Sequence, residues 1–153
     1  MNTKNNLRIF NFFSSEEQIK TLDTFRIIYF ITFLLSFFLT EFGREIYRPF
    51  IYNNNINDLG IADSIGNLGG MVAQVFFMLV ILNSTKKKGI KLIVFIVHGY
   101  ILYEILQPIL PRGTFDWKDI YGTFIGGLIS LIIFLLINQF KHNTIYLVFG
   151  EEK

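Results

Sequence analysis

The sequence contains no cysteine and only two histidines, which removes several kinds of site at once. Without thiols the chain can form neither a disulfide framework nor a thiolate metal site, and its redox compartment cannot be inferred. His98 and His142 fall far apart in the expected topology, so imidazole ligation of a metal is not favoured either. We therefore expect no metal site and no cofactor.

The familiar catalytic motifs are also missing. The chain has no glycine-rich phosphate loop, no HExxH motif and no GxSxG motif. The formal net charge of +2 says little by itself, and we expect no nucleic-acid partner. An enzyme is not excluded, but the sequence favours it less than a binding or structural role.

What the chain has in abundance is apolar sequence. Hydrophobic residues make up 52% of it, 18 of its 153 residues are Phe, and the mean hydropathy is +0.45. This composition indicates an integral membrane protein with one domain. Apolar runs cover residues 27–40, 64–85, 92–111 and 120–140, and only Glu104 places a charge inside them. Since hydrocarbon cannot satisfy free backbone groups, runs of about 20 apolar residues must be helices.

The sequence thus predicts an all-α membrane protein with four transmembrane helices in antiparallel hairpins. The first run reaches spanning length if Arg26 extends its side chain to the inner surface and residues 41–50 begin the outer interface. We expect residues 1–20 to be a cytoplasmic leader rather than a signal peptide, residues 21–141 to be the transmembrane domain, and residues 142–153 to be a cytoplasmic tail. Outer loops are expected at residues 41–63 and 111–119.

The distribution of basic residues predicts the orientation. One side would carry ten of the 14 Lys and Arg residues, namely Lys4, Arg8, Lys20, Arg26, Lys86, Lys87, Lys88, Lys91, Lys141 and Lys153. The other side would carry Arg44, Arg48, Arg112 and Lys118. The positive-inside rule therefore puts both termini in the cytoplasm.

The unusual chemistry lies in residues 104–130. Helical periodicity puts Glu104 and Gln107 on one face of the third helix and His98 on the opposite face, where we expect a packing histidine. Pro108 should kink this helix and leave the carbonyl of Glu104 without a backbone donor. A carboxylate in a membrane span costs roughly 2.5 to 3.5 kcal/mol on insertion scales, so Glu104 needs a counter-ion, a proton or a ligand. The candidate counter-ions are Arg112, Arg44 and Arg48.

The turn after this helix and the helix that follows have simpler interpretations. Asp116 is expected to cap a helix that starts near Trp117, and Asp119 lies in its first turn, where the helix dipole favours negative charge. Small residues repeat at four-residue spacing in two helices, which is typical of close helix packing: Gly122, Gly126 and Ser130 in the fourth helix, and Gly66 and Gly70 in the second. In the second helix we expect Gln74 to form an interhelical hydrogen bond and Asn67 to line a polar pocket.

These residues carry a family likeness. The chain resembles VanZ-like membrane proteins at Glu104, Gln107, Pro111, Arg112, Phe115, Asp116, Asp119 and Gly126. The likeness covers roughly the last third of the chain, and Asp63 followed by Asn67 is similar to an Asp and His pair of that family. Asn67 departs from the family's His, and Thr123 replaces a usual Asn. The family is similar to a protein linked to low-level resistance to the glycopeptide teicoplanin, so the resemblance implies a multi-pass protein of the bacterial cytoplasmic membrane.

We hypothesise an outward-facing polar pocket that binds an envelope lipid headgroup or a cell-wall precursor. Its expected ligand-binding residues are Glu104, Gln107, Arg112, Asp116, Asp119, Asn67, Arg44 and Glu41. Arg beside carboxylates could meet both charges of a zwitterion. Three alternatives stay open: an enzyme acting on a lipid-linked substrate, with Glu104 or Asp119 as general base; a small proton-coupled transporter; and a structural subunit. The expected partners are membrane lipid and either a second copy or another membrane protein.

Overall fold

The computed structural model describes residues 24–82, 84–111 and 113–149, with side chains for residues 25–140 of these ranges. Every regular element in this described part is a helix. Four helices are long and apolar enough to cross a membrane: Phe25–Asn53, Ile61–Leu82, Lys86–Ile109 and Trp117–Phe140. The chain therefore has the character of a multi-pass membrane protein. The expected leader, residues 1–20, lies outside the described residues.

The first helix is longer than its apolar run predicted. Helix α2 (Thr24–Phe42) continues through a π-helical turn, η2 (Gly43–Tyr47), into α3 (Arg48–Asn53), with helical backbone at both junctions. Pro49 explains the wide turn, because proline lacks an N–H and its ring would crowd the carbonyl four residues earlier. The outer loop expected over residues 41–63 therefore shrinks to the non-helical residues 54–60.

Helix α4 (Ile61–Leu82) begins after this short loop, and Asp58 organises its start. The Asp58 carboxylate accepts hydrogen bonds from the backbone N–H groups of Gly60, at 3.0 Å, and Ala62, at 2.6 Å. Gly60 needs its left-handed φ of +83° to turn the chain here. The Tyr47 hydroxyl of η2 also donates to Asp58 at 3.2 Å, which ties the start of α4 to η2.

Helix α5 (Lys86–Leu106) ends where Pro108 requires it to end. The chain tightens into a 3-10 turn, η3 (Gln107–Ile109), so the helix terminates there and does not continue beyond a kink. The backbone N–H of Gln107 donates to the carbonyl of Glu104. The expectation that this carbonyl would lack a donor was therefore wrong, because the tighter turn supplies one.

Helix α6 (Trp117–Phe149) starts at the expected residue. The Asp116 carboxylate accepts a hydrogen bond from the backbone N–H of Lys118 at 2.9 Å, which is the geometry of an N-cap. The helix continues to Phe149, so its backbone extends through part of the expected tail.

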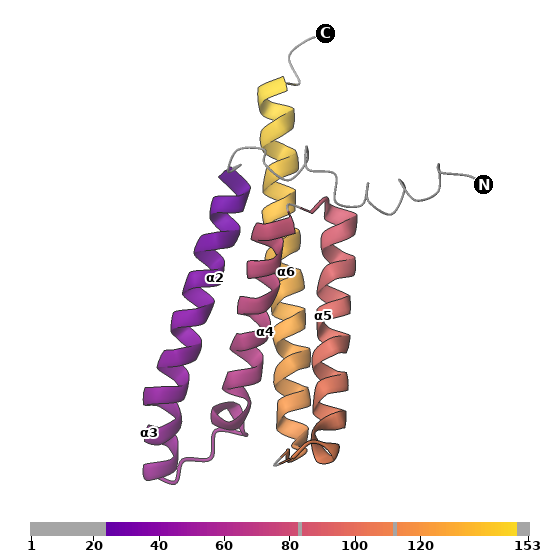
Figure 1. The fold of residues 1–153 in the computed structure, drawn as a ribbon. Coiled ribbons are helices and arrows are strands. Elements are labelled where there is room, and N and C mark those ends of the chain that lie inside the picture. Colours follow the sequence, from indigo (N-terminus) through magenta and orange to yellow (C-terminus); the bar gives the residue numbers. More distant parts are fainter. Residues whose placement is uncertain (1–23, 83, 112, 150–153) are drawn as a thin grey trace, which may run out of the picture.

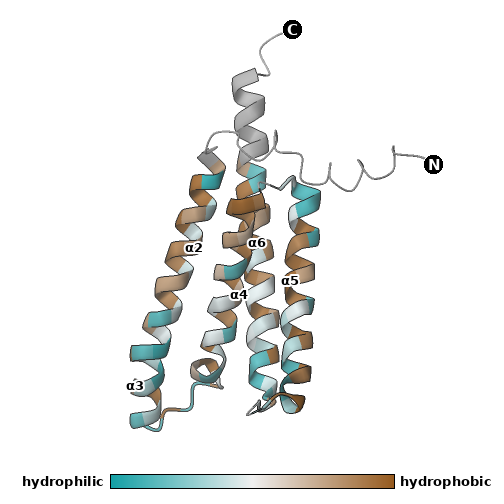
Figure 2. Cartoon of the chain, viewed as in Figure 1, coloured by the Kyte–Doolittle hydropathy of each residue, from teal (hydrophilic) through white to brown (hydrophobic). Residues whose placement is uncertain are grey.

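The four long helices lie side by side, and successive ones run in opposite directions (Figure 1). Helix α4 contacts α2, α5 and α6. The best-packed core includes Tyr29, Phe76 and Phe134, whose rings meet at centroid distances of 6.0 and 6.1 Å. Hydrophobic residues occupy much of the length of the helices, and hydrophilic ones are more frequent toward the helix ends (Figure 2). This core lies toward the end at which α2 begins, and the polar site described next lies toward the opposite end.

Candidate functional site

Glu104 is the centre of a buried hydrogen-bond network. The residue is 2% exposed. The Asn67 amide of α4 donates to Oε1 at 3.1 Å, and the Gln107 amide donates to Oε2 at 2.6 Å. Each carboxylate oxygen thus receives one neutral donor, which lowers the cost of burying the group. The structure brings together three residues that the sequence assigned to one pocket.

A counter-ion for Glu104 is not found among the described side chains. No ion pair within 4.0 Å involves Glu104 in that part of the chain. Arg112, the first expected counter-ion, lies outside the described residues. Arg44 pairs with Glu41 at 3.7 Å, and Arg48 lies 3.9 Å from Asp63. The two described candidates are therefore engaged elsewhere.

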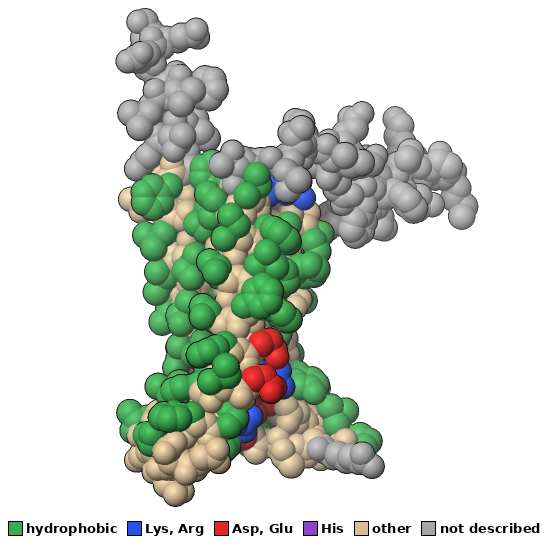
Figure 3. Space-filling view, turned by 90° about the vertical axis from the view of Figure 1, so that its left-hand side faces the viewer, with side chains coloured by type: hydrophobic (Ala, Val, Ile, Leu, Met, Phe, Trp, Pro, Cys, Tyr) green, Lys and Arg blue, Asp and Glu red, His purple; other side chains and the backbone are tan. Residues whose placement is uncertain are grey.

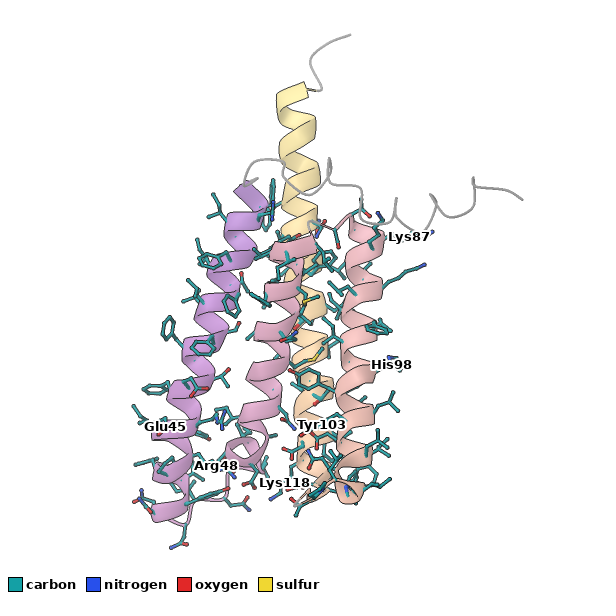
Figure 4. All side chains as sticks on the ribbon, in the orientation of Figure 1. Glu45, Arg48, Lys87, His98, Tyr103 and Lys118 are labelled. Carbon is teal, nitrogen blue, oxygen red and sulfur yellow. The ribbon has the colours of Figure 1, made fainter. Side chains whose placement is uncertain are left out.

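A second network lies on the exposed surface beside the first. Asp63 of α4 meets Lys118 of α6 at 2.5 Å and accepts a hydrogen bond from the Tyr52 hydroxyl. Arg48 donates to Tyr52 at 3.1 Å and lies over its ring. The side chains of Arg48 and Lys118 are 44% and 50% exposed, so both cations remain accessible. Figure 4 shows Arg48 and Lys118 at the same end of the bundle, opposite the end that carries Lys87.

Sequence reasoning missed this second network as a unit. Tyr52 follows Arg48 by four residues, which would have indicated a shared helical face. The signal was lost because residues 41–63 were assigned to a loop, where such spacing has no meaning. Asp63 was noted only for its likeness, with Asn67, to an Asp and His pair of the VanZ-like family.

Asp119 is close enough to both networks to interact with their charges. It interacts electrostatically with Glu104 of the first network and with Arg48 and Asp63 of the second. Its carboxylate accepts no side-chain hydrogen bond from the described residues, and it is only partly buried. One turn further into α6, the Thr123 hydroxyl is fully buried and has no hydrogen-bond partner in the described part of the chain. The Asp119 carboxylate and the Thr123 hydroxyl can therefore still accept hydrogen bonds.

The remaining expected site residues occupy other positions. Asp116 is an exposed capping residue, as its turn predicted. Glu41 and Arg44 lie on the α2 side of α4, next to Gly66, and not with Glu104. His98 faces outward from α5, where its ring bonds the carbonyl of Val94 at 2.7 Å (Figure 4). Its ring therefore has a hydrogen-bond partner and lies away from the site, as expected, but it is exposed and does not pack inside the described bundle.

The two glycine repeats behave differently. An added Cβ would lie 2.7 Å from the Ser64 carbonyl oxygen at Gly122, and 2.4 Å from the Leu68 carbonyl oxygen at Gly126. Ser130 is fully buried on the same helix. At Gly66 and Gly70, in contrast, nothing lies within 4 Å of an added Cβ. Within the described chain no neighbouring helix packs closely on Gly66 and Gly70, so their expected role in helix packing stays a prediction.

The charged side chains visible on the surface lie toward the same end of the bundle as the two networks. On the face toward α2, hydrophobic side chains cover most of the helical length, and acidic and basic side chains gather toward the α3 end (Figure 3).

No group of three or more His, Cys, Asp or Glu suited to a metal occurs among the described residues. Chemically, the site offers buried and half-buried carboxylates next to two accessible cations. Such a surface can hold a molecule that carries both charges.

Comparisons with protein-family models, with curated proteins and with solved structures gave no match.

Proposed function

We propose that the chain is a VanZ-like protein of the bacterial cytoplasmic membrane. Its four long helices would form two antiparallel hairpins with both termini in the cytoplasm. The charge distribution supports this orientation, because Lys86, Lys87, Lys88 and Lys91 cluster at one end of the bundle. Glu104, Asp63 and Lys118 would then face outward, at headgroup depth.

We further propose that this outward site binds a zwitterionic envelope molecule, either a lipid headgroup or a cell-wall precursor. The observation that carries the proposal is the Glu104 carboxylate, buried at 2% exposure and held by two neutral amides with no described cation beside it. An uncompensated carboxylate in a span calls for a cationic group. A ligand's ammonium would meet Glu104 and Asp119.

The anionic part of the ligand would meet the second network. Arg48 and Lys118 both contact Asp63, yet their side chains stay 44% and 50% exposed, so both cations can reach a phosphate. Guanidinium and ammonium groups are the usual phosphate-binding groups of proteins. With cations outermost and carboxylates deeper, the site is complementary to a molecule that carries a phosphate and an amine.

Lipid retention tests the proposal. The full chain is purified in mild detergent from membranes that contain phosphatidylethanolamine and phosphatidylglycerol, and bound lipid is counted by native mass spectrometry. The wild type should retain the zwitterionic lipid preferentially. Glu104→Gln, which keeps the size of the side chain and removes its charge, should lose this preference, and Lys118→Gln should weaken retention of either phospholipid.

Glu45→Gln is the matched control, because Glu45 is an exposed carboxylate near the same end of the bundle. It should leave retention unchanged. Equal lipid retention by the wild type and by a folded Glu104→Gln variant would refute the proposal. Teicoplanin susceptibility of cells that express each variant extends the test to the glycopeptide link.

The burial of Glu104 favours a second candidate, a proton-coupled transporter. A carboxylate that is 2% exposed and has no described counter-ion is suited to carry a proton. In this case solute flux into vesicles would collapse when the proton gradient is dissipated. Lipid retention with no such flux would favour the binding function.

A further inference from the structure

A groove lies between α2 and α4, away from the Glu104 site. Its cavity volume is about 360 Å³. Phe37, Gly70, Gln74 and Phe77 are among its lining residues, and Glu41 and Arg44 line its end toward α3, which we call the rim. We call this feature the α2–α4 groove.

Gln74 indicates that the groove has an occupant, because an empty groove would leave its polar side chain facing hydrocarbon. Its side chain is exposed, and its amide forms no hydrogen bond with any residue that the structure describes. It follows Ile61 by 13 residues and precedes Leu82 by eight, which places it about 20 Å and 12 Å from the two helix ends. This depth is inside the hydrocarbon layer, where an unsatisfied amide is costly. The expected interhelical hydrogen bond of Gln74 is therefore not made within the described chain.

The rim of the groove carries two side chains of opposite charge at similar depth in the membrane. Glu41 and Arg44 are one helical turn apart, and their side chains are 43% and 55% exposed. Their mutual separation of 3.7 Å is a weak exposed contact, which leaves both groups able to pair with another molecule. An occupant of the groove should supply an amide at the depth of Gln74 and both charges at the rim.

We propose that the occupant is a second copy of this chain, related by a twofold axis along the membrane normal. Such an axis places identical residues at identical depth, so each Gln74 meets the other, and an amide can both donate to and accept from its equal. Glu41 of each copy then lies at the depth of the other Glu41 and about one helical turn from the depth of the other Arg44, close enough for each acid to pair with the base of the other copy. The groove surface is thus self-complementary in charge and in hydrogen bonding.

A lipid chain satisfies these groups less well. A phospholipid could place its phosphate near Arg44, but its acyl chain has no polar atom at the depth of Gln74. Side chains of glutamine in transmembrane helices characteristically bond across helix interfaces. The depth of the amide therefore decides between protein and lipid.

Cysteine cross-linking tests the proposal directly, because the chain has no native cysteine. Phe77→Cys puts one thiol in the groove, and Phe95→Cys puts one on the outer face of α5, where Phe95 is 77% exposed. Oxidation in native membranes should convert Phe77→Cys to a covalent dimer, while Phe95→Cys should give only the background of random collisions. Equal yields for the two variants would overturn the proposal.

Dimer fraction measured by single-molecule photobleaching in vesicles provides the second test. Gln74→Leu should lower the association constant about 3- to 30-fold, the range of interhelical hydrogen bonds in membranes, and Gln74→Asn should recover part of it. Gly70→Phe should fill the groove and abolish the dimer, whereas Gly99→Phe, at another glycine with open space around it, should not. A monomeric wild type, with or without a phospholipid retained in the groove, would refute the second-copy assignment.

Discussion

The contact between α4 and α6 gives the sharpest stability prediction, because it is made backbone to backbone at Gly126. A Cβ at this position would lie 2.4 Å from the Leu68 carbonyl oxygen and 3.0 Å from Met71 Cβ. Ordinary contact starts near 3.4 Å, so α6 would have to move from α4 by about 1 Å, the difference between 3.4 and 2.4 Å. A carbonyl within a helix cannot rotate away to make room.

The size of the effect follows from comparison with a glycine in open space. Gly126→Ala should lose about 1–3 kcal/mol through overpacking, and both Gly126→Ala and Gly70→Ala gain the same helix propensity of up to about 1 kcal/mol. The difference between the two variants therefore isolates the contact. We expect Gly126→Ala to be less stable than Gly70→Ala by about 1–3 kcal/mol.

Unfolding by sodium dodecyl sulfate in bicelles, followed by helicity, measures this difference. Gly99→Ala serves as a further control, because its added Cβ also meets nothing within 4 Å and it lies outside the α2–α4 groove. If Gly126→Ala and Gly70→Ala unfold with free energies that agree within about 0.5 kcal/mol, the close approach of α4 and α6 does not limit stability and the reasoning fails.

Further predictions concern the site and its turn, each checked by the same unfolding measurement. Gln107→Leu should cost about 1–3 kcal/mol, because one oxygen of a buried carboxylate loses its donor. Asp116→Ala should cost about 0.5–2 kcal/mol by removing the cap of α6, whereas Thr114→Ala, on the same exposed turn, should cost little. Lys118→Gln should hardly change stability, since its ion pair with Asp63 is exposed; a large loss would contradict this assignment.

The helices could be predicted from the sequence wherever apolar runs were uninterrupted. Residues 64–85 and 120–140 carry no charge, and both lie largely within helices of the structure. The first helix was predicted too short, because Glu41, Arg44 and Pro49 each argue against a continuing apolar helix. A π turn lets the backbone continue in spite of the proline, and sequence periodicity does not contain that information.

Within the candidate site, local geometry was predictable and long-range pairing was only partly so. Helical phase alone predicted that Gln107 would lie beside Glu104, three residues earlier on the same helix. Asn67 was assigned to the pocket from its depth, but its contact with Glu104 depends on how α4 and α5 are rotated against each other. The network of Tyr52, Asp63 and Lys118 joins three helices, and its members carry no shared pattern in the sequence.

The two glycine repeats show why spacing alone cannot assign a role. Gly66 with Gly70 and Gly122 with Gly126 have the same four-residue interval, and each pair follows an aspartate at the start of its helix. Only beside Gly122 and Gly126 does the backbone of a neighbouring helix occupy the space that a larger side chain would need. Since small residues in a span cost packing unless something approaches them, the open pair calls for an occupant that the single chain does not supply. The stability of Gly126→Ala and the dimerisation of Gly70→Phe should therefore respond to different contacts, one within the chain and one between copies.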